Sequence, residues 1–237
     1  MKIVFTPDWF LTSDILIDVF SFVILLVFFM FAFRSYKLSK KRRILYIGIG
    51  FLLIALAELS NIMTKLPLYY HTQIVHQIGA AVVSYDIVKT VDIFYYFGFF
   101  FDRILTLLGL YLMYKLPLER VSGEFFLNIY LIVIISLMSQ SFYYVYHLTA
   151  LILLIFLINK FYKIYRKDGV TNTGILVMAF VLLALSQMVF LFSELNYVYV
   201  TGQFIQLASY LMLLILIVKI VKDGKKEKPS GNHPRHA

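Results

Sequence analysis

The sequence predicts an all-α integral membrane protein, a polytopic bundle of seven transmembrane helices. The first observation is composition: 61% of the 237 residues are hydrophobic and only 15% are charged, whereas soluble domains are nearer half apolar and a quarter charged. The second is that apolar runs of span length recur along almost the whole chain. The third is that basic residues follow every second run, which is the pattern of alternating membrane sides.

The apolar runs lie near 12–33, 44–64, 92–114, 124–139, 143–163, 174–193 and 201–221. The fourth run is short, and the start of the third is the least sharply marked. Together the runs make residues 1–222 one transmembrane domain, with no room between them for a kinase, nuclease or dehydrogenase module. The first run follows Asp8 and Asp14 and precedes a basic cluster, the wrong polarity for a cleaved signal peptide, so we expect it to be retained.

Basic residues fix the expected orientation. They follow the first, third, fifth and seventh runs, and they are Arg34, Lys37, Lys40, Lys41, Arg42, Arg43, Lys115, Arg120, Lys160, Lys163, Arg166, Lys167, Lys219, Lys222, Lys225, Lys226 and Lys228. The positive-inside rule places these segments in the cytoplasm of a cell-membrane protein, with the N-terminus extracytoplasmic and the C-terminus cytoplasmic. Aromatic residues of the other connections would form an outer belt, and they are Trp9, Tyr69, Tyr70, Tyr143, Tyr144 and Tyr197.

The same rule accounts for the formal net charge of +9, so we expect no nucleic-acid partner. The last residues, 223–237, combine glycine, proline and charge without apolar periodicity. They are predicted to form a disordered basic tail on the cytoplasmic side.

An internal repeat is visible in the chain. Residues 17–63 align with 146–192 without a gap, which pairs Tyr36 with Tyr165 and FLLIALAEL (51–59) with FVLLALSQM (180–188). A looser match pairs LLGLYLM (107–113) with LASYLM (207–212). We therefore predict parallel three-helix repeats, at about 12–114 and 143–221, joined by a linker helix at about 124–139.

This three-plus-one-plus-three plan resembles the SWEET and PQ-loop transporters in topology. The resemblance implies a substrate path between the two bundles. The Pro-Gln pair of the PQ-loop family is absent from both copies, so no transported substrate carries over. The run GILVMAFVLLALSQMVFLFSELNYVYVTGQFIQLASYLMLLILI (174–217) also resembles uncharacterised archaeal membrane proteins and the membrane sensor regions fused to archaeal histidine kinases.

Two charged residues fall near the middle of the third run. Asp102 and Arg103 lie about ten residues into it, which is about 15 Å at 1.5 Å per residue. Charges at that depth cost several kcal/mol unless they are paired or hydrated. Two interpretations stand side by side: a proton or substrate relay, and a structural ion pair that locks this helix into the bundle. A later start of the span would instead place Asp102 at the interface.

A second polar group gathers toward the outer helix ends. Glu58 is the repeat equivalent of Gln187, and Asp18 is the equivalent of His147, while Asn61 and Lys65 continue the face of Glu58. In the seventh run Gln203, Gln206 and Tyr210 form one stripe. The predicted ligand-binding set is Glu58, Asp102, Arg103, Gln187, Asp18, His147, Gln203 and Gln206. Interhelical hydrogen bonding is the alternative role for these groups.

Metal and cofactor chemistry has weak support in the sequence. His71 and His76 occupy the connection 69–90, which could form an amphipathic or re-entrant helix, and with His147 they are the metal or haem candidates. Their five-residue spacing does not place His71 and His76 on one helical face. The last span holds Lys219 only at its cytoplasmic end, which argues against retinal, and the chain has no cysteine. We expect no cofactor.

The leading functional hypothesis is a membrane protein that handles a small molecule or ion between the two repeats, as a transporter would. The alternative is a non-transporting sensor or assembly subunit that acts through a membrane or cytoplasmic partner protein. The third is an electron-transfer subunit that binds haem or quinone. An enzyme is less expected, because no Ser-His-Asp arrangement, phosphate loop or HExxH motif is present.

Overall fold

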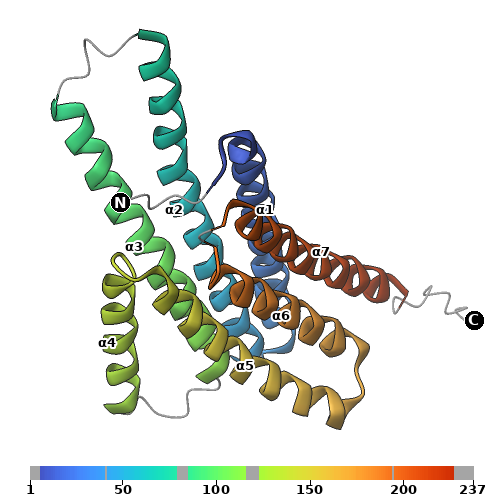
Figure 1. Ribbon diagram of the computed structural model, residues 1–237. Coiled ribbons are helices and arrows are strands. Elements are labelled where there is room, and N and C mark those ends of the chain that lie inside the picture. Colours follow the sequence, from blue (N-terminus) through green and yellow to red (C-terminus); the bar gives the residue numbers. More distant parts are fainter. Residues whose placement is uncertain (1–5, 41, 79–84, 116–122, 194, 227–237) are drawn as a thin grey trace, which may run out of the picture.

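The computed structural model describes the backbone of residues 6–40, 42–78, 85–115, 123–193 and 195–226, and this part of the chain is all-α (Figure 1). Its helices are α1 (Leu11–Ser39), α2 (Arg42–Ile78), α3 (Tyr85–Lys115), α4 (Gly123–Met138), α5 (Tyr143–Asp168), α6 (Thr171–Phe190) and α7 (Asn196–Lys226). A short 3₁₀ turn, η1 (Asp8–Phe10), precedes α1. Each of the seven predicted apolar runs overlaps one helix.

Six of these helices are long and apolar enough to span a membrane. They are α1, the Ile44–Leu66 part of α2, the Tyr96–Lys115 part of α3, α5, α6, and the Asn196–Lys222 part of α7. The chain is therefore a multi-pass membrane protein whose outer surface contacts lipid. Helix α4 is apolar but has only 16 residues, about 24 Å at 1.5 Å per residue, against a hydrocarbon core of about 30 Å.

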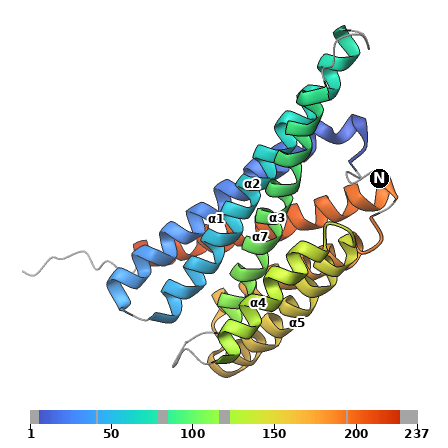
Figure 2. The same ribbon diagram turned by 90° about the vertical axis from the view of Figure 1, so that its left-hand side faces the viewer.

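The second and third helices extend further than the sequence indicated. Helix α2 continues to Ile78 and α3 begins at Tyr85, so most of the connection 69–90 continues these two helices instead of forming a separate one. The resulting hairpin reaches past the other helices at one end (Figures 1 and 2). The side chains of 67–78 and 85–95 lie outside the described part of the structure.

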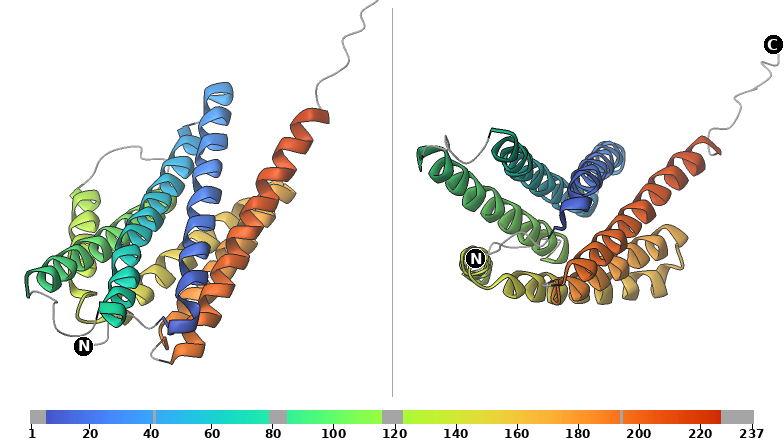
Figure 3. Two further views of the ribbon diagram at one scale, coloured as in Figure 1. Left: turned by 90° about the horizontal axis from the view of Figure 1, so that it is seen from above. Right: turned by 45° about the horizontal axis from the view of Figure 1, so that its top comes forward.

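Six helices close into a ring. Helix α2 packs against α1 and α3, and α6 packs against α5 and α7, while contacts of α1 with α7 and of α3 with α5 join the two groups. Helix α4 lies outside this ring against α3 and α5 (Figure 3). Helices α1, α3, α5 and α7 all run from one end of the bundle, here called the polar end, toward the other, the basic end. Asp14 meets Tyr199 at the polar end, whereas Lys160 meets the carbonyl of Tyr114 toward the basic end.

Small residues set the closest helix contacts. A Cβ atom on Gly109 would lie 2.7 Å from the carbonyl oxygen of Gly50, so α2 and α3 touch backbone to backbone there. In the second group of helices, the Ser209 hydroxyl donates a hydrogen bond of 2.8 Å to the Ala179 carbonyl, where α7 crosses α6. Ala179 is the equivalent of Gly50 in the ungapped repeat alignment. These crossings hold α2 and α6 close to their neighbours and leave their inner faces toward the centre of the ring.

Candidate functional site

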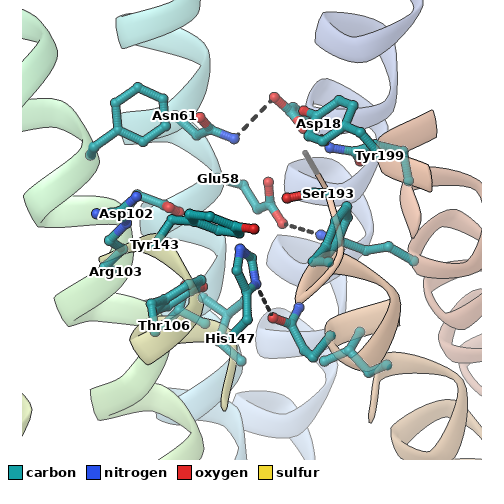
Figure 4. A pocket seen from close by; sticks show the side chains of 18 of the residues that line it. Asp18, Glu58, Asn61, Asp102, Arg103, Thr106, Tyr143, His147, Ser193 and Tyr199 are labelled. Atoms are coloured by element: carbon teal, nitrogen blue, oxygen red, sulfur yellow. Dashed lines mark hydrogen bonds between the residues drawn. The ribbon is translucent and has the colours of Figure 1, made fainter. Parts of the chain in front are cut away.

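A polar cavity lies inside the ring at the polar end, with a volume of about 160 Å³. All six ring helices contribute to its lining. The structure places every member of the predicted ligand-binding set in that lining: Glu58, Asp102, Arg103, Gln187, Asp18, His147, Gln203 and Gln206. Figure 4 shows the labelled side chains converging on one space from several helices. Whether the eight residues bind a ligand remains a prediction.

A buried ion-pair cluster forms one wall of the cavity. The Lys65 ammonium lies 2.8 Å from Oδ2 of Asp14 and 2.6 Å from Oδ2 of Asp18, and all three side chains are at most 6% exposed. Asn61 also donates a hydrogen bond of 3.2 Å to Oδ2 of Asp18. The two aspartates are one turn apart on α1, which turns both toward α2. The cluster holds two carboxylates and one ammonium and therefore carries a formal charge of −1.

Helix α7 joins this cluster through a tyrosine. The Tyr199 hydroxyl donates to Oδ1 of Asp14 at 3.0 Å, and the amide of Gln203 donates to the Tyr199 oxygen at 2.9 Å. Thr6, before α1, adds a longer hydrogen bond of 3.4 Å to Asp14. Asp14 thereby connects α1, α2 and α7 at the polar end.

Glu58 points toward the centre of the ring from α2. Its Oε1 atom accepts hydrogen bonds from the Tyr210 hydroxyl at 2.8 Å and from the Gln206 amide at 3.3 Å. Gln206 also donates to the Tyr210 oxygen at 3.2 Å. Glu58 is 6% exposed, and within the described part of the structure it makes no ion pair. Both of its hydrogen-bond donors are neutral, so a carboxylate in this position favours an added cation or a proton.

His147 faces the cavity from α5. Its Nδ1 atom lies 2.8 Å from Oε1 of Gln187, and because an amide oxygen only accepts, Nδ1 carries the hydrogen. Nε2 is then the acceptor of a neutral imidazole. The rings of Tyr146 and Phe190 lie 4.9 Å and 5.3 Å from the imidazole and fix its orientation. Glu58 and Gln187, which are paired in the ungapped alignment, thus differ in their partners: the Glu58 carboxylate accepts from Tyr210 and Gln206 on α7, whereas the Gln187 amide accepts from His147 on α5.

Asp102 and Arg103 serve different neighbours, as their adjacent positions on α3 require. Arg103 is 8% exposed, and its Nη1 donates a hydrogen bond of 2.9 Å to the hydroxyl of Ser139, just after α4. Its guanidinium also lies 5.8 Å from the Tyr146 ring centre. Asp102 is half-buried in the cavity wall, and within the described residues it makes no hydrogen bond. Arg103 therefore ties α3 to the end of α4, whereas Asp102 remains available to the cavity.

Two amide oxygens in the same wall lack donors. Oδ1 of Asn61 and Oε1 of Gln203 are buried without a hydrogen-bond partner, although both residues donate through their nitrogens. Turning either amide around would direct its oxygen at the oxygen that now accepts from it. Native proteins rarely leave such acceptors unpaired, so a water, an ammonium group or a metal ion has a place here.

Several residues of the cavity and its ion-pair cluster carry little signal in the sequence. Asp14 lies at the flank of the first apolar run, and its spacing of four residues from Asp18 is the signal that places both on one helix face. Ser139 gave no signal, because its contact with Arg103 depends on how α4 returns along α3. Nothing in the sequence distinguishes Tyr146 and Tyr199 from the other tyrosines among the 18 in the chain.

The metal candidates are not brought together by anything described. His147 lines the cavity, while the side chains of His71 and His76 lie outside the described residues. Among the described residues, no group of three or more histidine, cysteine or acidic side chains could hold a metal ion.

Comparison with known proteins yields no match among family models, curated proteins or solved structures.

Proposed function

We propose that this membrane protein binds a small cation in the polar cavity, between the group α1 to α3 and the group α5 to α7. The supporting observation is the excess of oxygen acceptors in the wall: carboxylates of Asp18, Glu58 and Asp102 and the unpaired amide oxygens of Asn61 and Gln203. The ligand class is an alkali ion or a small protonated amine. Both bring positive charge and satisfy oxygen acceptors.

Charge supports this ligand class. Three acidic side chains, Asp18, Glu58 and Asp102, and two basic ones, Lys65 and Arg103, line the cavity. Lys65 is committed to Asp14 and Asp18, and Arg103 donates to Ser139. Glu58 and Asp102 are left without an ammonium or guanidinium hydrogen bond. Uncompensated charge inside a membrane protein costs several kcal/mol, and a bound cation removes that cost.

Size limits the ligand. The cavity volume of about 160 Å³ is close to the roughly 150 Å³ of an apolar cavity that accepts one benzene molecule. An alkali ion with a few waters, or an amine of a few heavy atoms, fits this space. A disaccharide or a peptide does not.

We also propose that α1 to α3 and α5 to α7 are two copies of one three-helix unit. Three features support it: the packing of α1, α2 and α3 recurs in α5, α6 and α7, the contact of α3 with α5 corresponds to that of α7 with α1, and α1 and α5 end in the same way. The backbone N–H of Lys40 bonds to the Tyr36 carbonyl, as that of Gly169 bonds to Tyr165, both at 2.8 Å. Both pairs are equivalent in the ungapped alignment. A ligand at the centre of the ring then contacts both repeats.

Cation binding is testable with purified protein in detergent or nanodiscs. Sodium, potassium, lithium and methylammonium chlorides are titrated at constant ionic strength against N-methylglucamine chloride, and thermal unfolding is followed. A ligand that binds only the folded state stabilises it by about 2.7 kcal/mol at a hundred times its dissociation constant. Equal unfolding temperatures in every salt would contradict the proposal.

Two variants assign the effect to the cavity. Glu58→Gln and Asp102→Asn keep the size of each side chain and remove its charge, and each is expected to weaken cation binding about thirty-fold or more. Glu124→Gln is the matched control, because the Glu124 side chain is 77% exposed at the start of α4. Its affinity should equal that of the unmodified protein.

A further inference from the structure

A second cavity lies toward the basic end of the bundle. It has a volume of about 380 Å³ and is lined by α1, α2, α5, α6 and α7. Most of its lining is apolar, with Phe28 and Phe161 among the aromatic contributors. It therefore lies between the same two groups of helices as the polar cavity.

One stripe of residues on α2 connects the two cavities. Ile47 lines the second cavity, while Ile54 and Glu58 line the polar cavity. Phe51 lies between them, and the spacings of four, three and four residues place all four on one helix face. From Ile47 to Glu58 the stripe is about 16 Å long at 1.5 Å per residue.

Helix α6 carries the equivalent stripe. Leu176 lines the second cavity, and Leu183 and Gln187 line the polar cavity, with Phe180 between them. Each of these positions is the ungapped repeat equivalent of one on α2. The two stripes thus lead from one cavity to the other on opposite sides of the ring.

The two phenylalanines meet at the centre. The rings of Phe51 and Phe180 stack with centroids 6.2 Å apart and planes within 5°, and their exposed fractions are 1% and 2%. Phe28 packs at 4.3 Å against Phe51, and Phe161 at 5.6 Å against Phe180. Each group of helices thus supplies two rings to this layer, here called the phenylalanine layer (Phe28, Phe51, Phe161 and Phe180).

We infer that the two cavities are the halves of one pathway through the bundle and that the phenylalanine layer is its closed gate. This inference rests on the proposed function, because the small cation bound near Glu58 is what would pass. Dispersion between rings holds the layer, and no hydrogen bond or ion pair crosses it in the described residues. Movement of α1 to α3 relative to α5 to α7 would separate Phe51 from Phe180 without breaking a polar contact there.

Passage of a cation through the bundle is a further activity beyond binding. It predicts that the two cavities are reached from opposite sides of the membrane. The chain has no cysteine, so single cysteines can be introduced without background. Thr106→Cys reports on the polar cavity and Thr173→Cys on the second one. In sealed vesicles, a membrane-impermeant thiol reagent should label the two variants from opposite sides. Labelling of both from the same side, or of Thr173→Cys from neither, would overturn the pathway.

The gate itself is tested by flux. In liposomes, the cation that binds most tightly in the titration of sodium, potassium, lithium and methylammonium is the probe. The Phe51→Ala/Phe180→Ala variant is expected to pass it at least about ten-fold faster than the unmodified protein. Phe51→Leu/Phe180→Leu is the second variant. Leucine fills more of the space than alanine, so this protein should fold even if the alanine variant does not. Its flux should still rise, because the stacked rings are removed. Phe156→Ala is the matched control: its ring stacks on Tyr114 at 5.6 Å between α3 and α5, away from both cavities.

The outcomes separate this inference from the proposed function. Unchanged flux in both layer variants, with cation binding intact, would overturn the gate and leave the binding site standing. An absence of cation binding together with opposite labelling of the two cysteines would reject the ligand class but support the pathway.

Discussion

Lys65 is the residue on which the polar end of the bundle depends most. Its ammonium contacts both Asp14 and Asp18, at 2.8 Å and 2.6 Å, and all three groups are buried. In a hydrophobic protein interior, removing one partner of a buried ion pair costs about 3–5 kcal/mol, because the remaining charge is uncompensated. Replacing all partners together is far less costly.

The first prediction concerns this cluster. Lys65→Met leaves two buried carboxylates four residues apart on α1, and it should lower the free energy of unfolding by about 3–5 kcal/mol. The triple variant Lys65→Met/Asp14→Asn/Asp18→Asn should recover most of that loss. Chemical unfolding in detergent micelles measures both. A Lys65→Met protein as stable as the parent would show that the ion pairs of Lys65 contribute little to the free energy of unfolding.

The second prediction concerns competition between protons and the bound cation. Glu58 and Asp102 must be ionised to attract a cation, and a proton on either carboxyl group neutralises it. The apparent affinity for the cation should therefore fall as the pH falls. Titrations at a series of pH values measure this, and Glu58→Gln/Asp102→Asn should flatten the pH dependence. The same slope in that variant would assign the pH effect to other groups.

Residue pairs that the ungapped alignment of 17–63 with 146–192 brings together are the part of the cavity lining that the sequence predicts. Glu58 with Gln187, and Asp18 with His147, stood out because a polar side chain recurred at the same place in two apolar helices. They do face one cavity. The contact of Arg103 with Ser139 could not be predicted, because it joins α3 to a turn whose position depends on the whole fold. Periodicity locates a polar side chain on a helix face but does not identify its partner.

At the scale of elements, the two helix hairpins α1–α2 and α5–α6 turn in the same way with different residues. Lys40 has φ 55° and Gly169 has φ 63°, both in the left-handed region. Glycine adopts this conformation without strain, whereas a residue with a Cβ atom loses about 1–2 kcal/mol. The first hairpin thus carries strain that the second avoids.

The third prediction follows from that difference. Lys40→Gly should stabilise the protein by up to about 1 kcal/mol, since relief of the left-handed strain outweighs the added freedom of the unfolded chain. Gly169→Ala should destabilise it by about 1 kcal/mol, and no heavy atom within 4 Å would meet the new Cβ, so the backbone is the cause. Thermal unfolding of the two variants should shift in opposite directions. Shifts of the same sign would contradict the argument.

Helix limits show where periodicity stops being informative. The apolar runs located each helix, and the ends of α5 and α6 lie within a few residues of basic or polar segments that the sequence displays. The apolar spans of α2 and α3, Ile44–Leu66 and Tyr96–Lys115, lie within a few residues of the predicted runs. The helices themselves are longer: α2 ends 14 residues after its run and α3 begins seven residues before its own, because the chain past Leu66 loses its apolar run but keeps its helical backbone. An apolar run marks the part of a helix that can lie in the membrane, whereas the helix itself can continue beyond that part.

At the scale of the whole molecule, the number of membrane crossings depends on the path of α4. It begins beside the end of α3, where Lys115 and Glu124 lie 3.5 Å apart. Asn128 then donates to the Tyr111 hydroxyl at 3.1 Å, and Gln140 donates to the Tyr96 carbonyl at 3.4 Å. Helix α4 and the turn after it therefore run back along the whole Tyr96–Lys115 segment, about 30 Å at 1.5 Å per residue.

A seventh crossing is the fourth prediction. If α3 spans the membrane, a chain that returns along its full length crosses as well, and α5 can then begin on the same side as α3. Seven crossings put the two ends of the bundle on opposite sides, and the positive-inside rule assigns the basic end to the cytoplasm.

Cysteine labelling in sealed cells measures this topology in the cysteine-free chain. Ser141→Cys, in the turn between α4 and α5, should react from outside, whereas Lys40→Cys and Val170→Cys, in the turns after α1 and α5, should react only once the membrane is opened. The distinction is sharp because a re-entrant α4 would leave α3 and α5 starting on opposite sides. Ser141→Cys would then be protected together with Lys40→Cys, and the parallel arrangement of α3 and α5 that encloses the polar cavity would be lost.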